Sequence, residues 1–268
     1  MVMTLQMKLA RDGQITEEMK EVAQKEHVTP EFVQKGIASG RIIITKNNLH
    51  KIPSLGIGEG LFTKINSNIG TSMFVCDKTM EIEKAKISLK YGADTLMDLS
   101  TGKTEADVRE LRQQILRDIP IPLGTVPIYQ AGLRAQRRNG AIIDLTEDDM
   151  FSVVEEQAKE GVDFFTIHCG ITKQLCDHIK QHPRTMGIVS RGGTFLVAWI
   201  LHNGQENPYY KNFDYLLEMA QKYDFSLSLG DGMRPGCVFA ATDYSQVNEL
   251  LETSKLVQRC WDKNVQSW

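Results

Sequence analysis

A pattern of buried strand followed by amphipathic helix repeats along the chain from Lys64 onward. The predicted strands cover residues 64–70, 94–100, 121–129, 164–170, 187–193 and 225–232. Capping boxes at Thr104 and Thr146 begin two of the helices between them. Because strands separated by helices pair in parallel through right-handed crossovers, the repeat predicts an α/β fold. Residues 265–267 begin a seventh strand, so we expect a (β/α)8 TIM-type barrel that is truncated after about six βα units.

Two further features support the repeat. The junctions at 92–94 and 161–163 are near copies, since each ends a helix on glycine and enters a strand through aspartate. The last helix begins near Asp243, and its predicted apolar face carries Val247, Leu250, Leu251, Val257, Cys260 and Trp261.

Residues 1–63 lack this repeat and are predicted to form a small α+β N-terminal cap before the incomplete barrel of residues 64–268. The predicted elements of the cap are helices that begin at Thr16 and Thr29, a strand at 41–45 and a long loop over 46–60. An incomplete barrel leaves a sheet edge unpaired, which predicts poor solubility for the isolated chain.

Composition excludes several classes of partner. A formal net charge of −3 over 268 residues argues against a broad surface for nucleic acid or anionic membrane. No run reaches the roughly 18 apolar residues that a membrane span needs. The five cysteines are odd in number, scattered and free of any C-x-x-C pair, so neither a disulfide framework nor a zinc or cluster knuckle is expected. We predict a cytoplasmic protein.

Polar or small residues follow each predicted strand. They are Asn66, Asn68, Asp98, Ser100, Thr101, Tyr129, Gln130, His168, Cys169, Ser190, Arg191, Gly192, Gly193, Asp231 and Arg234. In a parallel barrel the carboxyl ends of the strands converge on one face, where active sites form. Asn, Asp, Ser and Gly also end strands for turn reasons alone. Because six strand ends agree, a polar pocket is the favoured interpretation.

Individual residues within this set have more than one interpretation. The segment S-R-G-G at 190–193 favours anion binding through backbone N–H groups, a hydroxyl and a guanidinium, against a structural turn with a surface arginine. His168 is either a functional donor, acid or base, or a hydrogen-bonded core residue. On sequence alone Met97 favours core packing. The run at Arg134, Arg137 and Arg138 is typical of a solvated basic loop.

Six motifs, in order, resemble the phosphomethylpyrimidine synthase family of thiamine biosynthesis. They are K-I-N-S-N-I-G-T-S (64–72), A-D-T-L-M-D-L-S-T-G (93–102), G-T-V-P-I-Y-Q-A (124–131), G-V-D-F-F-T-I-H-C-G (161–170), G-I-V-S-R-G-G (187–193) and S-L-G-D-G-M-R-P-G (228–236). The resemblance implies a radical S-adenosylmethionine enzyme, a carbon–carbon lyase that rearranges 5-aminoimidazole ribotide into 4-amino-5-hydroxymethyl-2-methylpyrimidine phosphate. A similar anaerobic branch makes 5-hydroxybenzimidazole, for cobamide biosynthesis, from the same substrate.

The resemblance also implies which residues bind the ribotide. By matching motifs these are Asn68, Met97, Tyr129, His168, Ser190, Arg191, Gly192, Asp231, Gly232, Met233 and Arg234. This assignment moves Met97 from the core to the pocket. The His168-Cys169 pair and the loop 135–144 lean toward the benzimidazole branch.

The chain departs from the family in its metal motifs. Members carry an E-G-P-G-H motif, a second metal histidine for zinc and a C-x-x-C-x-x-x-x-C that holds a [4Fe–4S] cluster, and none of these occurs in the 268 residues. The resemblance implies a homodimer in which the cluster-bearing tail reaches the partner's site. We therefore expect a truncated member whose own activity is doubtful. The alternatives are a non-catalytic ribotide-binding remnant and an acid–base barrel enzyme that uses His168 and Asp231.

Overall fold

The structure, a computed structural model, describes residues 5–268, so residues 1–4 of the predicted cap lie outside it. Its main sheet has five parallel strands that neighbour one another in chain order. They are β3 (Asn66–Ile69), β4 (Thr95–Asp98), β5 (Leu123–Thr125), β6 (Phe164–Ile167) and β7 (Ser226–Leu229). This order is that of consecutive strands in a (β/α) barrel and confirms a parallel α/β fold. The eight-stranded barrel stays a prediction.

The last residues of the chain add to the sheet beside β7. Ser267 pairs in parallel with Leu227, whose N–H donates to Gln266 O at 3.0 Å and whose carbonyl accepts from Trp268 N at 3.0 Å. The chain therefore forms a parallel bridge where a strand at 265–267 is predicted to begin, and the strand itself stays a prediction.

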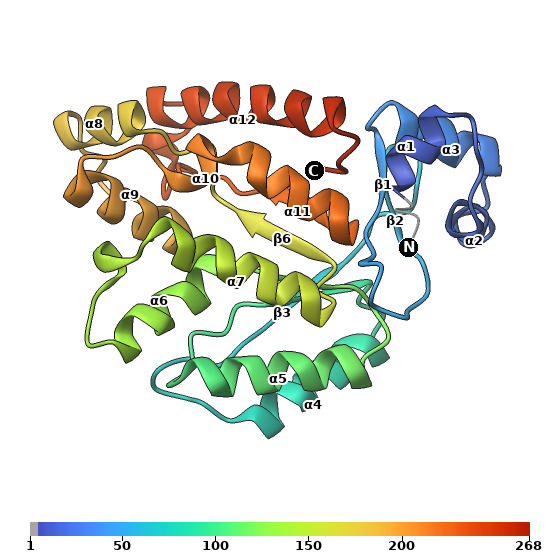
Figure 1. The fold of residues 1–268 in the computed structure, drawn as a ribbon, viewed down its shortest axis with the longest axis horizontal. Coiled ribbons are helices and arrows are strands. Elements are labelled where there is room, and N and C mark those ends of the chain that lie inside the picture. The colour runs from blue at the N-terminus through green and yellow to red at the C-terminus, as the bar shows by residue number, and fades with distance from the viewer. Residues whose placement is uncertain (1–4) are drawn as a thin grey trace.

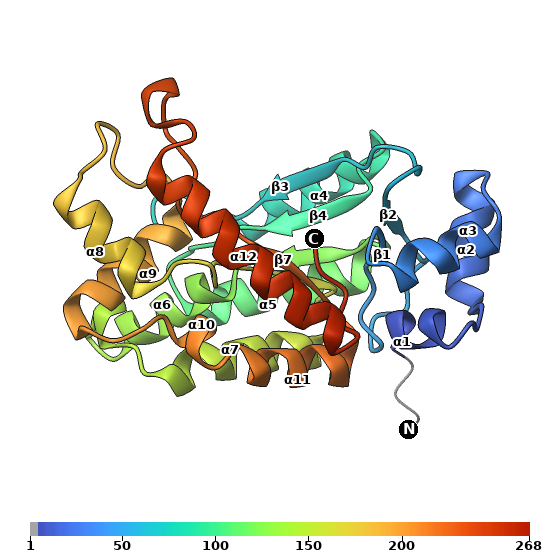
Figure 2. The same cartoon turned by 90° about the horizontal axis from the view of Figure 1, so that it is seen from above.

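Helices follow the strands and cover one face of the sheet (Figures 1 and 2). They are α4 (Lys78–Lys90), α5 (Glu105–Asp118), α6 (Pro127–Arg137), α7 (Glu147–Glu160), α8 (Lys173–Gln181), α9 (Arg191–Asn203), α10 (Pro208–Lys211), α11 (Phe213–Tyr223) and α12 (Tyr244–Asp262), with 3-10 turns η1 (Ile142–Asp144) and η2 (Val238–Ala240). None of the helices in residues 5–268 has the length and apolarity that crossing a membrane would demand.

The two faces of the sheet differ in chemistry because side chains alternate along a strand. Ile69 and Leu96 point toward the helices and pack with Leu111 of α5. The opposite face carries Asn66 and Asn68 on β3, beside Thr95 and Met97 on β4 in the paired register. A side chain at Gly124, on this same face, would overlap the Phe164 ring. One face is thus an apolar core and the other includes polar positions.

The N-terminal segment forms a separate group of elements at one end of the molecule (Figure 1). It comprises α1 (Gln6–Arg11), α2 (Glu17–Glu26), α3 (Pro30–Ala38) and an antiparallel pair, β1 (Ile42–Ile44) with β2 (Gly56–Gly58). Thr16 and Thr29 cap α2 and α3 as predicted, accepting from Met19 N and Phe32 N at 3.2 Å each. The prediction of an uninterrupted loop over 46–60 is wrong, because residues 56–58 pair with β1. The domain boundary at residue 63 stays a prediction.

Two predicted strands are wrong in extent or existence. The strand predicted at 187–193 is absent from the described residues, since β6 pairs directly with β7 and leaves no place for it. Ser190 instead begins α9, where its Oγ accepts from Gly193 N at 3.1 Å. The strand predicted over 121–129 ends at Thr125 because Pro127 begins α6, a position that suits its fixed φ and missing N–H. Tyr129 therefore lies in a helix.

The last helix begins as predicted but presents a different face. Asp243 caps α12 by accepting from Gln246 N at 2.9 Å. Leu250 and Leu251 are 67% and 54% exposed, so the predicted apolar face is wrong for them. The helix buries Glu249 instead, which lies 3% exposed against the loop after β7.

One buried carboxylate, that of Asp163, links several segments at the amino end of the sheet. Asp163, at the second of the two copied junctions, accepts from Asn47 N at 2.9 Å and Leu123 N at 2.8 Å. His50 Nδ1 lies 2.8 Å from the same carboxylate, and His50 Nε2 lies 2.9 Å from Leu116 O. Both carboxylate oxygens of Asp163 and both ring nitrogens of His50 thus have hydrogen-bond partners, which is typical of a structural network.

Candidate active site at the carboxyl ends of the strands

His168 immediately follows β6 and is 5% exposed. Its Nε2 lies 3.1 Å from Ser190 Oγ, the cap of α9. The imidazole packs so closely on Gly192 that any side chain there would overlap the ring. The end of β6 and the start of α9 therefore meet at the carboxyl end of the sheet, although they are separated along the chain by another helix, α8.

The electrostatics keep His168 neutral. Burial, followed by the positive charge of Arg234, lowers the pKa of His168 to about 4. Its Nδ1 is buried and has no hydrogen-bond partner among residues 5–268. A neutral imidazole with one ring nitrogen left over can donate to or accept from a bound ligand, because buried polar atoms rarely stay unpaired.

Arg191 is the first residue of α9 and its side chain is exposed. Its guanidinium donates to Thr101 Oγ1 and to Leu99 O, each at 3.2 Å, in the segment after β4. It also lies 4.2 Å from the centre of the Tyr129 ring, in a cation–π contact. Ser190 and Arg191 stand at the start of α9, so the N–H groups of that helix end and a fixed cation lie close together.

A hollow of about 380 Å³ opens beside this arginine. Its walls come from α6, α9, η1 and the segment after β4, and they include Thr101, Tyr129, Arg191 and Phe195. The Tyr129 and Phe195 rings meet edge to face with centroids 6.0 Å apart. The volume lies within the range of small-molecule sites, about 300–1,000 Å³. An aromatic wall with one cation suits a ligand that has both a ring and an anionic group.

A glutamate on α12 hydrogen-bonds to the backbone of the loop after β7. Glu249 accepts from Gly232 N at 2.8 Å and from Met233 N at 2.7 Å. Burial raises the pKa of Glu249 to about 7, although both amides oppose the shift. Met233 is fully buried, while Asp231 is 72% exposed at its side chain and pairs with Arg234 at 3.5 Å. The carboxylate therefore fixes a loop that presents Asp231 to solvent.

Asn68 and Met97 are neighbours in the register of β3 and β4. Asn68 is exposed, whereas Met97 is 6% exposed and belongs to the main apolar cluster. Within residues 5–268 no hydrogen bond joins either of them to His168, so the structure places them on the same sheet and not in direct contact. Thr71, just beyond β3, has a buried Oγ1 without a hydrogen-bond partner in that part of the chain.

The predicted site residues thus fall into two groups. Those with direct contacts at the start of α9 are Tyr129, His168, Ser190, Arg191, Gly192 and Gly232, whose backbone packs on Gly193; those without such a contact are Asn68, Met97, Asp231, Met233 and Arg234. Sequence analysis missed Glu249, because nothing in an i, i+4 pattern distinguishes a buried glutamate on a helix from an exposed one.

The described residues do not fit a cluster or a zinc ion. No group of three or more His, Cys, Asp or Glu side chains within 5–268 is placed to hold a metal. Cys176 and Cys260 are buried, and no two cysteines of the sequence have the C-x-x-C spacing of a cluster site. We therefore derive no chemical step through either group.

A parallel sheet whose strand ends carry a cation, a helix start and a neutral imidazole has the arrangement with which α/β proteins commonly bind small ligands. The chain belongs to the radical SAM ThiC family, whose sequence model matches residues 5–268. The resemblance seen in the six motifs is thereby confirmed.

Several curated relatives are named as phosphomethylpyrimidine synthases. The chain is 53% identical over 261 residues to a phosphomethylpyrimidine synthase of Methanocaldococcus jannaschii, an alignment that covers 97% of this chain and 61% of the relative. It is 50% identical over 261 residues to phosphomethylpyrimidine synthase 2 of Methanothermobacter thermautotrophicus, with the same coverage of 97% and 61%. The Thermus thermophilus enzyme is 50% identical over 264 residues, covering 98% of this chain and 60% of the relative. The chain thus spans about three fifths of the length of these relatives.

Proposed function

We propose that the carboxyl-end face binds 5-aminoimidazole ribotide and that the chain supplies the substrate-binding part of a phosphomethylpyrimidine synthase. The single observation that supports this most is the cluster at the start of α9, where His168 Nε2 lies 3.1 Å from Ser190 Oγ beside the exposed Arg191. The family membership and the names of the relatives agree with it.

In this proposal the ribotide phosphate binds at residues 190–193. Arg191 offers a planar fork of donors, and the N–H groups at the start of α9 add a positive dipole end. The aminoimidazole ring enters the hollow against Tyr129, and His168 Nδ1 hydrogen-bonds to the substrate as a neutral group. Asn68, Met97 and the loop from Asp231 to Arg234 complete the pocket once the ribotide is bound.

The reaction proposed for the whole enzyme is the radical rearrangement of the ribotide to hydroxymethylpyrimidine phosphate. A [4Fe–4S] cluster and S-adenosylmethionine supply the radical in such enzymes. What the described residues contribute is binding and orientation of the ribotide. We propose that residues 1–268 by themselves bind it without turnover, and that turnover needs a cluster-bearing polypeptide. Zinc, a homodimer and the 5-hydroxybenzimidazole product stay predictions.

Calorimetric titration with 5-aminoimidazole ribotide tests the binding proposal. We expect Arg191→Ala to weaken binding at least tenfold, because it removes the charged partner of the phosphate. Arg41→Ala is the matched control, since Arg41 is also an exposed arginine and lies in the N-terminal group. Absence of heat with the unaltered chain, or equal binding by Arg191→Ala, contradicts the proposal.

Anaerobic incubation with ribotide, S-adenosylmethionine and a chemical reductant tests the second part. We expect mass spectrometry to detect no new product with the chain alone. Detection of hydroxymethylpyrimidine phosphate or of 5-hydroxybenzimidazole would contradict the proposed need for cluster-bearing residues outside 1–268, and its mass would identify the branch.

A further inference from the structure

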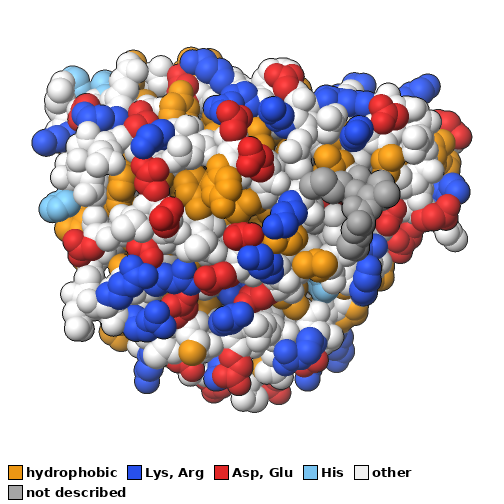
Figure 3. Space-filling view, in the orientation of Figure 1, with side chains coloured by type: hydrophobic (Ala, Val, Ile, Leu, Met, Phe, Trp, Pro, Cys, Tyr) orange, Lys and Arg blue, Asp and Glu red, His pale blue; other side chains and the backbone are white. Residues whose placement is uncertain are grey.

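A second hollow lies in the outer helical layer, away from the carboxyl ends of the strands. It has a volume of about 430 Å³ and is enclosed by α5, α6 and α7. Its lining is Glu105, Ala106, Arg109, Arg134, Arg137, Arg138 and Glu156. Four arginines and two glutamates give this lining a formal charge of +2 (4 − 2) in a chain whose net charge is −3. In Figure 3 Lys and Arg side chains gather over this part of the surface. The hollow is unrelated to the proposed function.

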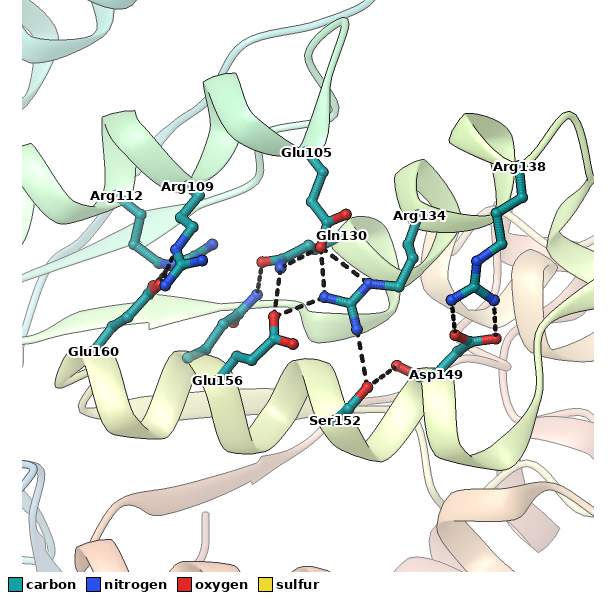
Figure 4. Close-up of polar contacts among 11 residues, drawn as sticks. Glu105, Arg109, Arg112, Gln130, Arg134, Arg138, Asp149, Ser152, Glu156 and Glu160 are labelled. Atoms are coloured by element: carbon teal, nitrogen blue, oxygen red, sulfur yellow. Dashed lines mark hydrogen bonds and ion pairs between the residues drawn. The ribbon is translucent and has the colours of Figure 1, made fainter.

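Arg134 forms the rigid floor of this hollow (Figure 4). Its side chain is only 11% exposed, and its guanidinium contacts Glu105, Glu156 at 2.7 Å and Ser152 Oγ at 2.9 Å. Gln130 also donates to Glu105 at 3.0 Å. The prediction of a solvated basic loop is therefore wrong for Arg134, because its guanidinium pairs with both glutamates of the lining.

The other three arginines stand at the rim. Arg109 and Arg138 are 53% and 57% exposed and pair with Glu160 at 2.7 Å and Asp149 at 2.9 Å, two carboxylates outside the lining. Arg137 is exposed and forms no ion pair within residues 5–268. Glu160 and Asp149 are only 8% exposed, so these pairs hold the two arginines in place, and a ligand would bind the guanidinium N–H groups that the pairs leave free.

We propose that this hollow is a second ligand site, which binds a small molecule bearing a diphosphate or a comparable pair of adjacent anionic groups. Guanidinium groups bind phosphate oxygens, and Arg137 offers its whole fork, while Arg138 offers the N–H groups that its two contacts with Asp149 leave free. Arg109 faces them from α5 on the opposite wall. The volume lies in the range of small-molecule sites, about 300–1,000 Å³, and exceeds what a single water-coordinated ion needs.

The test is a titration of inorganic pyrophosphate, followed by calorimetry. It is done in the Arg191→Ala background, so that the proposed ribotide phosphate site does not contribute and the two proposals fail separately. We expect the double substitution Arg137→Gln with Arg138→Gln to weaken binding at least tenfold. Arg138 also pairs with the buried Asp149, so thermal unfolding is measured alongside, and the single variant Arg137→Gln, at an exposed position without an ion pair in residues 5–268, should weaken binding with thermal unfolding unchanged.

The matched control is Arg41→Gln with Arg117→Gln, which removes the same charge at exposed positions outside the hollow. Binding within twofold of the parent supports the proposal. An equal loss in both double variants would mean nonspecific charge attraction and overturn it, as would unchanged binding in the Arg137 and Arg138 variant. A dimer that dissociates in that variant without any pyrophosphate binding would overturn it in favour of an interface between copies.

Discussion

The two ends of the parallel sheet hold one buried histidine each, and they are built in opposite ways. At the amino end, His50 uses both ring nitrogens, with Asp163 at 2.8 Å and Leu116 O at 2.9 Å. At the carboxyl end, His168 has a partner on Nε2 alone, and its Nδ1 has none among the described residues.

Their pKa values are shifted in opposite directions for the same reason. Burial acts to lower the pKa of His50, but the hydrogen bond and charge of Asp163 outweigh it and raise that pKa. His168 has no carboxylate, so burial and Arg234 together lower its pKa to about 4. A fully paired cluster stabilises the fold, whereas an incompletely paired one is available to a ligand. The amino end therefore has the features of a structural cluster, and the unpaired nitrogen at the carboxyl end supports the proposed binding there.

The largest expected effect is at the amino end. Asp163→Ala removes the acceptor of two backbone N–H groups and of His50, so we expect the free energy of unfolding to fall by about 4 kcal/mol. Urea unfolding followed by circular dichroism measures it. Asp94→Ala is the matched control, because Asp94 occupies the copied junction but accepts from Ile65 N near the exposed edge strand. An equal loss in both variants would argue against a special role for the Asp163 cluster.

The next effect concerns the loop that presents Asp231. Glu249→Ala leaves the N–H groups of Gly232 and Met233 without their acceptor, and we expect a loss of about 3 kcal/mol for the two. Faster hydrogen exchange at these two amides, with little change in β6, is the specific signature. Asp262→Ala, an exposed acid on the same helix, should change neither. Unchanged exchange at residues 232 and 233 would contradict the role of Glu249 as a positioning residue.

Sequence analysis predicted the parallel α/β fold, because the strand–helix alternation and the caps at Thr16, Thr29, Thr146 and Asp243 are local signals. It misplaced 187–193 because a short apolar run before S-R-G-G has the same pattern whether it enters a sheet or a helix. Only the direct pairing of β6 with β7 excludes the strand.

The candidate site was predicted as a set of residue types and not as an arrangement. The motif pattern suggested His168, Ser190 and Arg191, and the structure places these three together. It could not predict the Glu249 contact, because that depends on how α12 packs against a loop that is 17 residues distant from it at Gly232. The contact of Arg191 with Tyr129 likewise depends on α6 beginning at Pro127.

A pH effect separates the two histidines. The pKa of His168 is lowered on folding, so the folded state binds fewer protons than the unfolded state between about pH 4 and 6.5, and its stability rises with pH there. Between about pH 5 and pH 7 we expect the unaltered chain to gain about 2 kcal/mol more than His168→Gln. Measuring the difference between the two proteins cancels other titrating groups, including Glu249. Parallel pH profiles would mean that His168 keeps an ordinary pKa.

His50 should give the opposite slope. Its pKa is raised on folding, so its contribution is fully present below the unfolded value of about 6.5 and is lost as pH rises through the folded value. Compared with His50→Gln, the unaltered chain should therefore lose stability as the pH rises above neutral. The same sign for both histidines would end the contrast between the two ends of the sheet.

The smallest expected effect completes the comparison. Asp231 is 72% exposed and pairs with Arg234 at 3.5 Å, so Asp231→Asn should change the free energy of unfolding by less than about 0.5 kcal/mol. If the carboxyl end serves binding, the same substitution should weaken ribotide binding in calorimetry while the melting temperature is unchanged. Asp214→Asn is the matched control, since Asp214 is 67% exposed and pairs with Arg259 at 3.0 Å on the helical layer. If Asp231→Asn lowered the free energy of unfolding as much as Asp163→Ala does, the carboxyl end would also be a structural cluster. The physical basis for treating it as a binding face would then be lost.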